Sequence, residues 1–306
     1  MIGPLHVVVL MGGWSAERAV SLSSGGDVAK ALESLGHRVT RIDMDRDVAE
    51  RLREAAPDVV FNALHGTPGE DGTVQGMMDL MGLKYTHSGV ETSVIAIDKE
   101  LTKMVLVPLG IRMPVGTMVE SESLYEADPM ARPYVLKPVN EGSSVGVAIV
   151  AQGCNYGDPI GRESEGPWRH FERLLAEPFI RGRELTVAVL GDEALAVTEL
   201  QVKSGFYDYD AKYTDGITLH ICPAEIPDEI SAAAMKMALD GHRALGCRGC
   251  SRADFRWDDE RGEAGLYLLE INTQPGMTPL SLVPEQARYR GMGYAELVQK
   301  IVEEAL

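Results

Sequence analysis

Short apolar runs alternate with helical patterns along the first third of the chain. An alternation of strands and helices is typical of a parallel sheet covered by helices. The sequence therefore predicts an α/β domain at about 1–97. The apolar runs and helical patterns of this part are, in order, HVVVLM, 25–36, RVTRIDM, 46–55, DVVFNAL and 71–82.

The rest of the chain has fewer helical patterns and more strand patterns. ELTVAVLG and EALAVTELQV flank a short polar turn and predict an antiparallel hairpin. We expect two further domains, at 98–180 and 181–306. Other elements expected here are a helix in DKELTKMVLVPLGIRMP, strands VGTMV, PYVLKP and VGVAIV, a helix at about 227–245, and strands in SRADFRWDD and GLYLLEIN.

Composition places the chain among globular proteins and outside the membrane. It has 306 residues, of which 45% are hydrophobic and 25% charged. No run of about 18 apolar residues occurs, and the start MIGPLHVVVLMGG lacks the features of a signal peptide. We expect a cytoplasmic protein.

The charge balance excludes nucleic acid as a partner. The formal net charge is −17 and the pI is near 4.8, whereas phosphate backbones are bound by basic surfaces. An anionic small molecule would need local Lys or Arg residues, or metal ions.

The four cysteines do not form a disulfide framework in a chain of this length. They are Cys154, Cys222, Cys247 and Cys250. The motif CRGC at 247–250 has no second Cys or His pair, so buried reduced thiols are favoured over a zinc or redox site.

The stretch GLYLLEINTQPGMT ends an apolar strand with two oxygen ligands. Residues i and i+2 of a strand share a face, so Glu270 and Asn272 can reach one point, and Asp254 can join them from an adjacent hairpin strand. Carboxylate and amide oxygens suit Mg²⁺. The alternative is a solvated strand end. The turn after it could offer backbone N–H groups to a developing negative charge, or could be an ordinary strand-to-helix turn.

A turn of small residues follows Lys137 in KPVNEGSSVG. Glycine and serine allow a backbone to approach phosphate oxygens closely, although the sequence is not a Walker motif. We interpret it as a phosphate loop because of the adjacent lysine. A surface hairpin turn is the alternative.

Two more polar segments follow predicted strands of the first domain, where ligands bind in open parallel sheets. In GGWSAERAVSL, Glu17 and Arg18 could recognise a zwitterion, or Ser15 could simply cap a helix with Arg18 on the surface. In ALHGTPGEDG, His65 and Glu70 could face a substrate or be structural.

The segment KSGFYDYDAKYTDG, at 203–216, contains Lys212 and Tyr213 among other aromatic and acidic residues. Loops of this kind serve as lids that exclude water from an active site. The alternative is a disordered surface segment, which the aromatic content disfavours.

Taken together, six stretches resemble the D-alanine:D-alanine ligase family of the ATP-grasp superfamily, in the family's order and over nearly the whole chain. The resemblance implies an α/β fold, α+β overall, with a Rossmann-like N-terminal domain followed by a two-subdomain ATP-grasp fold. The stretches are GGWSAERAVSL, ALHGTPGEDG, KPVNEGSSVG, GRELTVAVL, FYDYDAKY and LLEINTQPGMT.

The resemblance also implies an activity. ATP would phosphorylate one D-alanine, and the amine of a second D-alanine would attack the acyl phosphate. The products would be D-alanyl-D-alanine for peptidoglycan precursors, ADP and phosphate. Two Mg²⁺ ions are implied, with Mn²⁺ as an alternative, and so is a homodimer.

Site residues follow from the resemblance position by position. Glu17 matches the residue that holds the first substrate's ammonium group, linked to Ser143 and Tyr213, and His65 lies beside that substrate. Ser281 and Leu282 match contacts to the second substrate, and Arg252 and the Gly276 amide match groups that face the oxyanion. Contacts to the ATP phosphates are Lys99, Lys137 and Lys212. Contacts to the adenine and ribose are Glu177, Ile180 and Glu184. The magnesium ligands are Asp254, Glu270 and Asn272.

Some positions depart from the family pattern or limit the resemblance. Pro178 stands where the family often has lysine, so a backbone carbonyl contact is kept and a side-chain contact is lost. Tyr213, where depsipeptide-forming relatives typically have phenylalanine, favours an amine nucleophile. The stretch 152–170 matches no motif.

Two other classes of protein stay open. One is another ATP-grasp ligase that joins a carboxylate to an amine. The other is a nucleotide-binding regulator without turnover.

Overall fold

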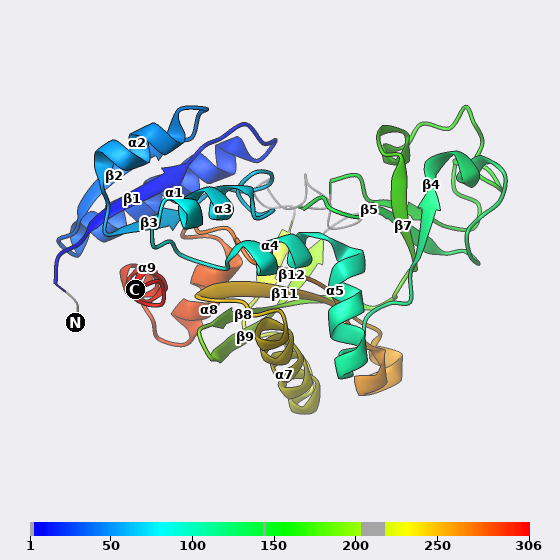
Figure 1. The fold of residues 1–306 in the computed structure, drawn as a ribbon. Helices are drawn as coiled ribbons and strands as arrows, with labels where there is room; N and C mark the ends of the chain where they lie inside the picture. Colours follow the sequence, from blue (N-terminus) through cyan, green and yellow to red (C-terminus); the bar gives the residue numbers. More distant parts are fainter. Residues whose placement is uncertain (1–2, 143–144, 203–217) are drawn as a thin grey trace.

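The first part of the chain folds around a parallel sheet, as predicted. The computed structural model describes residues 3–142, 145–202 and 218–306. The strand order is β2-β1-β3, with both neighbours parallel to the central strand. Helices cover this sheet (Figure 1). The elements are β1 (His6–Met11), α1 (Arg18–Ser34), β2 (Arg38–Asp43), α2 (Val48–Ala55), β3 (Val59–Asn62) and α3 (Thr73–Leu80).

Helix α1 begins at Arg18, seven residues before the predicted start. Its inner face carries small residues in place of the apolar side chains that a pattern search requires, among them Ser21 and Ser24. Gly25 shows why, since a Cβ there would lie 2.6 Å from the Met11 Cβ. The first two turns of the helix therefore pack closely on β1 through small residues, and buried apolar side chains such as Val28 and Leu32 follow only in the later turns.

A second, antiparallel sheet follows, with strand order β4-β7-β5-β6. Its strand β7 (Arg173–Pro178) was not predicted. Trp168 and Ile160, from the stretch 152–170 that matches no motif, are buried against this sheet, so part of that stretch belongs to its core. The other elements are α4 (Val90–Ile97), α5 (Lys99–Leu106), η1 (Val107–Leu109), β4 (Thr117–Glu120), η2 (Ser121–Tyr125), β5 (Tyr134–Pro138), β6 (Ala148–Val150) and η3 (Pro167–His170).

The third sheet has strand order β10-β9-β8-β11-β12, and all its described neighbours are antiparallel. Both predicted hairpins, β8–β9 and β11–β12, are confirmed. Helices α4, α8 and α9 were not predicted. The elements are β8 (Arg183–Leu190), β9 (Glu193–Val202), β10 (Thr218–Ile221), α7 (Asp228–Ala244), β11 (Cys250–Trp257), η4 (Asp259–Gly265), β12 (Leu266–Asn272), α8 (Leu282–Tyr289) and α9 (Tyr294–Glu303).

The two faces of this third sheet differ in chemistry. One face packs on α7 through apolar side chains that include Val187, Ala253 and Ile271. The residues one position along each strand lie on the other face, and Thr186, Asp254 and Glu270 among them are polar. The sheet therefore holds its polar side chains on a rigid support.

A β-bulge lies in β12 beside these polar residues. Asp254 pairs with Glu270, but the next residue, Phe255, pairs with Leu268, so Leu269 has no partner on β11. One extra residue shifts the alternation of a strand by one position. As a result, Leu269 and Glu270 both line the open face, while Leu268 and Ile271 are buried.

The C-terminal helices pack against the first sheet. The hydrophobic core there combines residues of β1, β3 and α1 with residues of α8 and α9, such as Val283 and Val298. Helix α9 lies beside α1, and the chain's two ends lie on the same side of the molecule (Figure 1). Within the described ranges, no helix is both long enough and apolar enough to cross a membrane.

Candidate active site

A cleft opens between the second and third sheets. It encloses about 800 Å³ including its open mouth, and Lys137, Ile180 and Asp254 are among its lining residues. A second cavity of about 360 Å³ lies next to it and reaches Glu70 and Asn272. Lys99, Glu141 and Glu270 line both, so the two cavities meet there.

The predicted metal ligands lie together on the polar face of the third sheet. Asp254 on β11 is the cross-strand partner of Glu270 on β12, and Arg252 is the partner of Asn272. The Asn272 Oδ1 accepts a hydrogen bond from the Gln274 amide at 2.8 Å, which orients its oxygen. Two carboxylates and an oriented amide oxygen on one rigid face fit a hard divalent cation.

Both carboxylates have cationic neighbours from the protein. Arg252 donates to the two oxygens of Asp254 at 2.8 and 2.7 Å, and Thr186 donates to its Oδ1 at 2.7 Å. Lys99, at the start of α5, places its Nζ 3.3 Å from the Glu270 Oε2. Arg252 and Lys99 thus supply positive charge at the place where an anionic substrate would meet the carboxylates.

Lys137 is held by a buried ion-pair network. Its Nζ lies 2.6 Å from one oxygen of Glu177, whose other oxygen contacts Lys103. Burial opposes the charge on Glu177, but the two ammonium groups outweigh it and hold its pKa below the usual range. Burial lowers the pKa of Lys103, and Glu177 offsets this only in part. Lys103 was not predicted as a site residue; only its position in the helix pattern could have suggested it.

The connector between β7 and β8 forms the far end of the cleft. Phe179, Ile180 and Glu184 line it, as does Arg256 from β11. Arg256 donates to the carbonyl oxygens of Ile180 and Gly182, each at 3.1 Å. Ile180 and Glu184 were predicted at this end of the cleft, and Arg256 was not.

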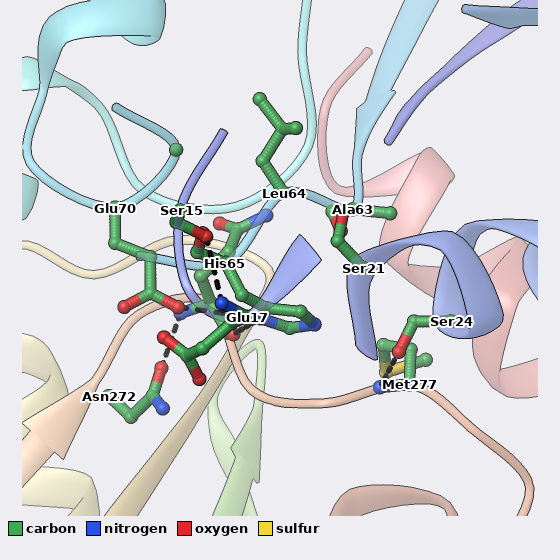
Figure 2. A network of polar contacts seen from close by, with 12 residues as sticks. Ser15, Glu17, Ser21, Ser24, Ala63, Leu64, His65, Glu70, Asn272 and Met277 are labelled. Carbon is green, nitrogen blue, oxygen red and sulfur yellow. Dashed lines mark hydrogen bonds and ion pairs between the residues drawn. The ribbon is translucent and has the colours of Figure 1, made fainter. Parts of the chain in front are cut away.

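A buried polar group lies at the carboxyl ends of β1 and β3. Glu17 at the start of α1, and His65 and Glu70 in the loop after β3, are each less than a tenth exposed. Figure 2 shows the Glu17 and Glu70 carboxylates and the Asn272 amide pointing toward one another. The structure therefore brings the predicted Glu17 and His65 next to the predicted metal ligands.

Electrostatics link these three residues. Burial disfavours the charged form of His65, but Glu70, Glu17 and the Gln274 carbonyl outweigh it and raise its pKa. Burial raises the pKa of Glu70, and the Glu17 carboxylate adds to this. The pocket thus combines the Glu17 carboxylate, which can bind a cation, with the His65 imidazole, which is more basic than usual.

Gln274 is a second residue that the sequence did not single out. Its carbonyl oxygen lies 3.0 Å from the His65 Nδ1, and its side-chain amide donates to the Asn62 carbonyl. It therefore ties the loop after β12 to the first sheet. In the same loop, a Cβ on Gly276 would lie 3.1 Å from the Ser281 Oγ, so Gly276 and Ser281 are neighbours. Leu282, the first residue of α8, is buried.

Other sequence-based interpretations have different outcomes. Arg18 forms a surface ion pair with Asp43, at 2.7 and 2.5 Å, so its surface interpretation is the correct one. Cys247 and Cys250 are free, and burial raises the pKa of each thiol to about 12. Among the described residues there is no group of three or more His, Cys, Asp or Glu side chains arranged for a metal. Ser143, Lys212 and Tyr213, and with them the predicted lid at 203–216, lie outside the described residues.

Comparisons with known proteins agree on one family. The family models for the D-ala D-ala ligase N-terminus and C-terminus match residues 45–88 and 118–303. A D-alanine–D-alanine ligase of Rhizorhabdus wittichii is 77% identical over 306 residues, covering 100% of this chain and 98% of its own. One from Sphingopyxis alaskensis is 76% identical over 304 residues, covering 99% of each.

A solved structure agrees as well. The D-alanine–D-alanine ligase of Bacillus anthracis complexed with ATP superimposes with a TM-score of 0.79 at 26% identity, covering 98% of this chain and 97% of that one. The fold is therefore the α/β ATP-grasp fold expected from the sequence. Because a family model spans more than half of the chain and close relatives match its full length, the chain belongs to the D-alanine–D-alanine ligase family.

Proposed function

We propose that this protein joins two D-alanine molecules to D-alanyl-D-alanine at the expense of ATP, for peptidoglycan precursor synthesis. The observation that carries the proposal is the cleft in which Lys99 and Lys137 lie beside the Asp254–Glu270 pair. A polyanionic nucleotide needs such local positive charge in a protein of net charge −17. The relatives' shared name and the ATP complex of the Bacillus anthracis enzyme support the same activity.

The reaction has two steps. A carboxylate oxygen of the first D-alanine attacks the terminal phosphorus of ATP, which releases ADP and leaves a D-alanyl phosphate. The amine of the second D-alanine then attacks the acyl carbon, forming the peptide bond and releasing phosphate and a proton. Holding the reactants together and away from water is the main contribution expected from the protein.

The nucleotide would lie along the cleft. Lys99 and Lys137 would contact its phosphates, together with Lys212 outside the described residues. Glu177 and Ile180 would lie at the adenine and Glu184 at the ribose. Glu177 supports this assignment through its place beside Lys137, where it also fixes that lysine's ammonium group.

Asp254, Glu270 and Asn272 would hold Mg²⁺, with two ions as the proposed number and Mn²⁺ as an alternative. When bound, the metal would neutralise charge on the transferring phosphoryl group. Arg252, which donates hydrogen bonds to Asp254 in this structure, would face the oxyanion of the second step together with the Gly276 amide.

The amino-acid substrates would occupy the second cavity and its surroundings. Glu17 would bind the ammonium group of the first D-alanine, with His65 beside it and Ser143 and Tyr213 completing the contacts. Ser281 and Leu282 would hold the second D-alanine. The buried Glu17, His65 and Glu70 support a site for a small zwitterion, since carboxylates and an imidazole can make charge-assisted hydrogen bonds to its ammonium and carboxylate groups.

An ADP-release assay with purified protein, ATP and Mg²⁺ tests the proposal. We expect release with D-alanine, little with L-alanine, and D-alanyl-D-alanine as the product. Release with a different amino acid or acid would favour another ATP-grasp ligase. ATP binding without any ADP release would favour a regulator. Preferential coupling of D-lactate at neutral pH would contradict the role given to Tyr213.

We also propose a homodimer formed through an apolar surface on α3, α4, α5 and η1. These elements follow one another along the chain and each contacts the next, and exposed apolar side chains grouped in this way mark association sites. Its exposed side chains are Leu80, Val94, Leu101, Met104 and Val107, which are 92%, 41%, 37%, 67% and 49% exposed. Gel filtration should give a dimer for the wild type and a monomer for Met104→Asp. A wild-type monomer would refute this surface.

The division into domains at 1–97, 98–180 and 181–306 is likewise our proposal, as is a cytoplasmic location. Separate apolar cores around the first and second sheets support the first two domains. The core shared by α1, α8 and α9 shows that the first and third parts of the chain are packed on each other.

A further inference from the structure

Arg256 lies at the end of the cleft proposed for the adenine, and the proposed function gives this residue no role. It lies on β11 two residues after Asp254, so both side chains project from the polar face of the third sheet. Its side chain is only 15% exposed, and it lines the cleft. A guanidinium group so far from bulk water requires partners for its donors.

Those partners lie on the connector between the two sheets that flank the cleft and at the start of β8. The Nε donates to the Ile180 carbonyl and one Nη to the Gly182 carbonyl, each at 3.1 Å. The other Nη lies 3.5 Å from the Glu184 Oε2, and the group sits 5.5 Å from the centre of the Phe179 ring. The Arg256 side chain thus contacts two backbone carbonyl groups, the Phe179 ring and the Glu184 carboxylate at this end of the cleft.

The hydrogen bond from Arg256 fixes the orientation of the Ile180 peptide group. Because its carbonyl oxygen is turned to Arg256, Ile180 cannot use that oxygen toward the cleft. The Ile180 N–H, in contrast, donates to no other described residue. An unpaired N–H at the wall of a cleft suits an acceptor nitrogen of a purine ring. Glu184, a neighbour of Arg256 on the same sheet face, is suited to accept from ribose hydroxyl groups.

We propose that Arg256 is a positioning residue for the nucleoside half of ATP, which fixes the Ile180 peptide and the Glu184 carboxylate in the orientation that reads base and ribose. The proposal rests on the function proposed above. It adds a specificity determinant on β11 that acts through the connector and does not touch the phosphates.

The test compares Arg256→Met and Arg256→Lys with Arg243→Met. Arg243 is an exposed arginine on α7 that is paired with Asp192, and neither residue lines the cleft. Each variant is assayed with ATP and with 2′-deoxy-ATP at saturating D-alanine, and the KM for D-alanine is measured at saturating ATP. Melting temperatures are recorded for all.

For Arg256→Met we expect a KM for ATP raised about 10-fold, the effect of misplacing one charge-assisted hydrogen bond, and an unchanged KM for D-alanine. The preference for ATP over 2′-deoxy-ATP should fall from the wild-type value to that of Glu184→Gln. The double variant Arg256→Met/Glu184→Gln should show the same preference as either single variant. Arg256→Lys should be intermediate, and Arg243→Met should match the wild type.

Three results would overturn the proposal: an unchanged KM for ATP, an equal rise in both KM values, or a lower melting temperature with an unchanged preference between the two nucleotides. The last two would identify a purely structural brace. If the wild type does not turn over ATP with D-alanine, the proposed function itself fails. That failure is distinguishable, because the wild-type assay is independent of the variants.

Discussion

The Nδ1 atom of His65 lies 3.0 Å from the carbonyl oxygen of Gln274. This contact joins the loop after β3 to the loop after β12. A carbonyl oxygen can only accept, so Nδ1 carries a proton. The other ring nitrogen, Nε2, is buried and makes no hydrogen bond to the described residues, so it is the ring atom left for the substrate contact that we propose.

Two substitutions at His65 should separate its two nitrogens. His65→Asn can still donate to the Gln274 carbonyl but has no group at the Nε2 position, so we expect a raised KM for D-alanine and little change in stability. His65→Leu should in addition lose about 1–3 kcal/mol of stability, because a buried carbonyl is left unpaired. Steady-state kinetics and urea unfolding of both variants check this. Equal stability of the two would contradict the proposed contact.

Lys103 should matter mainly for stability. It shares the buried Glu177 with Lys137, and removal of one partner of a buried ion pair costs about 3–5 kcal/mol. We expect Lys103→Met to be destabilised by this amount in urea unfolding, and Lys103→Met/Glu177→Gln to recover part of the loss.

Lys236→Met is the matched control for Lys103. Lys236 is 77% exposed in its pair with Asp240, so its loss should cost about 0–1 kcal/mol. If Lys103→Met were as stable as Lys236→Met, the buried charge of Glu177 would not need Lys103 as a partner.

Acid should destabilise the protein through His87. Burial lowers its pKa from 6.5 to about 3, with the nearby His65 as a smaller cause. Between these pH values the unfolded chain binds one proton more than the folded chain. The stability that the neutral His87 contributes is therefore complete above pH 6.5 and falls with decreasing pH, by up to about 1.4 kcal/mol per pH unit. His65, whose pKa is raised, acts in the opposite direction.

The variant His87→Asn isolates this contribution. His87 has φ +70°, a conformation that asparagine tolerates. The loss of stability between pH 7 and pH 5 should be smaller in this variant, by up to about 2 kcal/mol. Urea unfolding at both pH values measures it, with the exposed His170→Asn as control. The same loss in His87→Asn and wild type would refute the role of His87.

Strand periodicity and a hairpin were enough to predict that Asp254 could share a sheet face with Glu270 and Asn272, but the direct pairing of Asp254 with Glu270 comes from the structure. They were not enough to predict the bulge at Leu269, since LYLLEIN alone does not reveal where the alternation shifts. Lys103 and Gln274 were not predicted as site residues, for another reason. Their contacts, to Glu177 and to Asn62 and His65, span large sequence separations that a local pattern cannot register.

The last prediction concerns Glu270, which pairs with Lys99 and would bind metal. Glu270→Gln keeps the shape of the side chain and removes its charge, so the strand pairing with β11 should persist. We expect turnover to fall by about 100-fold or more, the effect of removing a charged group from the stabilisation of phosphoryl transfer. The Mg²⁺ concentration for half-maximal activity should rise, whereas the exposed Glu260→Gln should match the wild type. Near-normal ADP release by Glu270→Gln would eliminate the metal site proposed here, because no other described acid lies opposite Asp254 on β12.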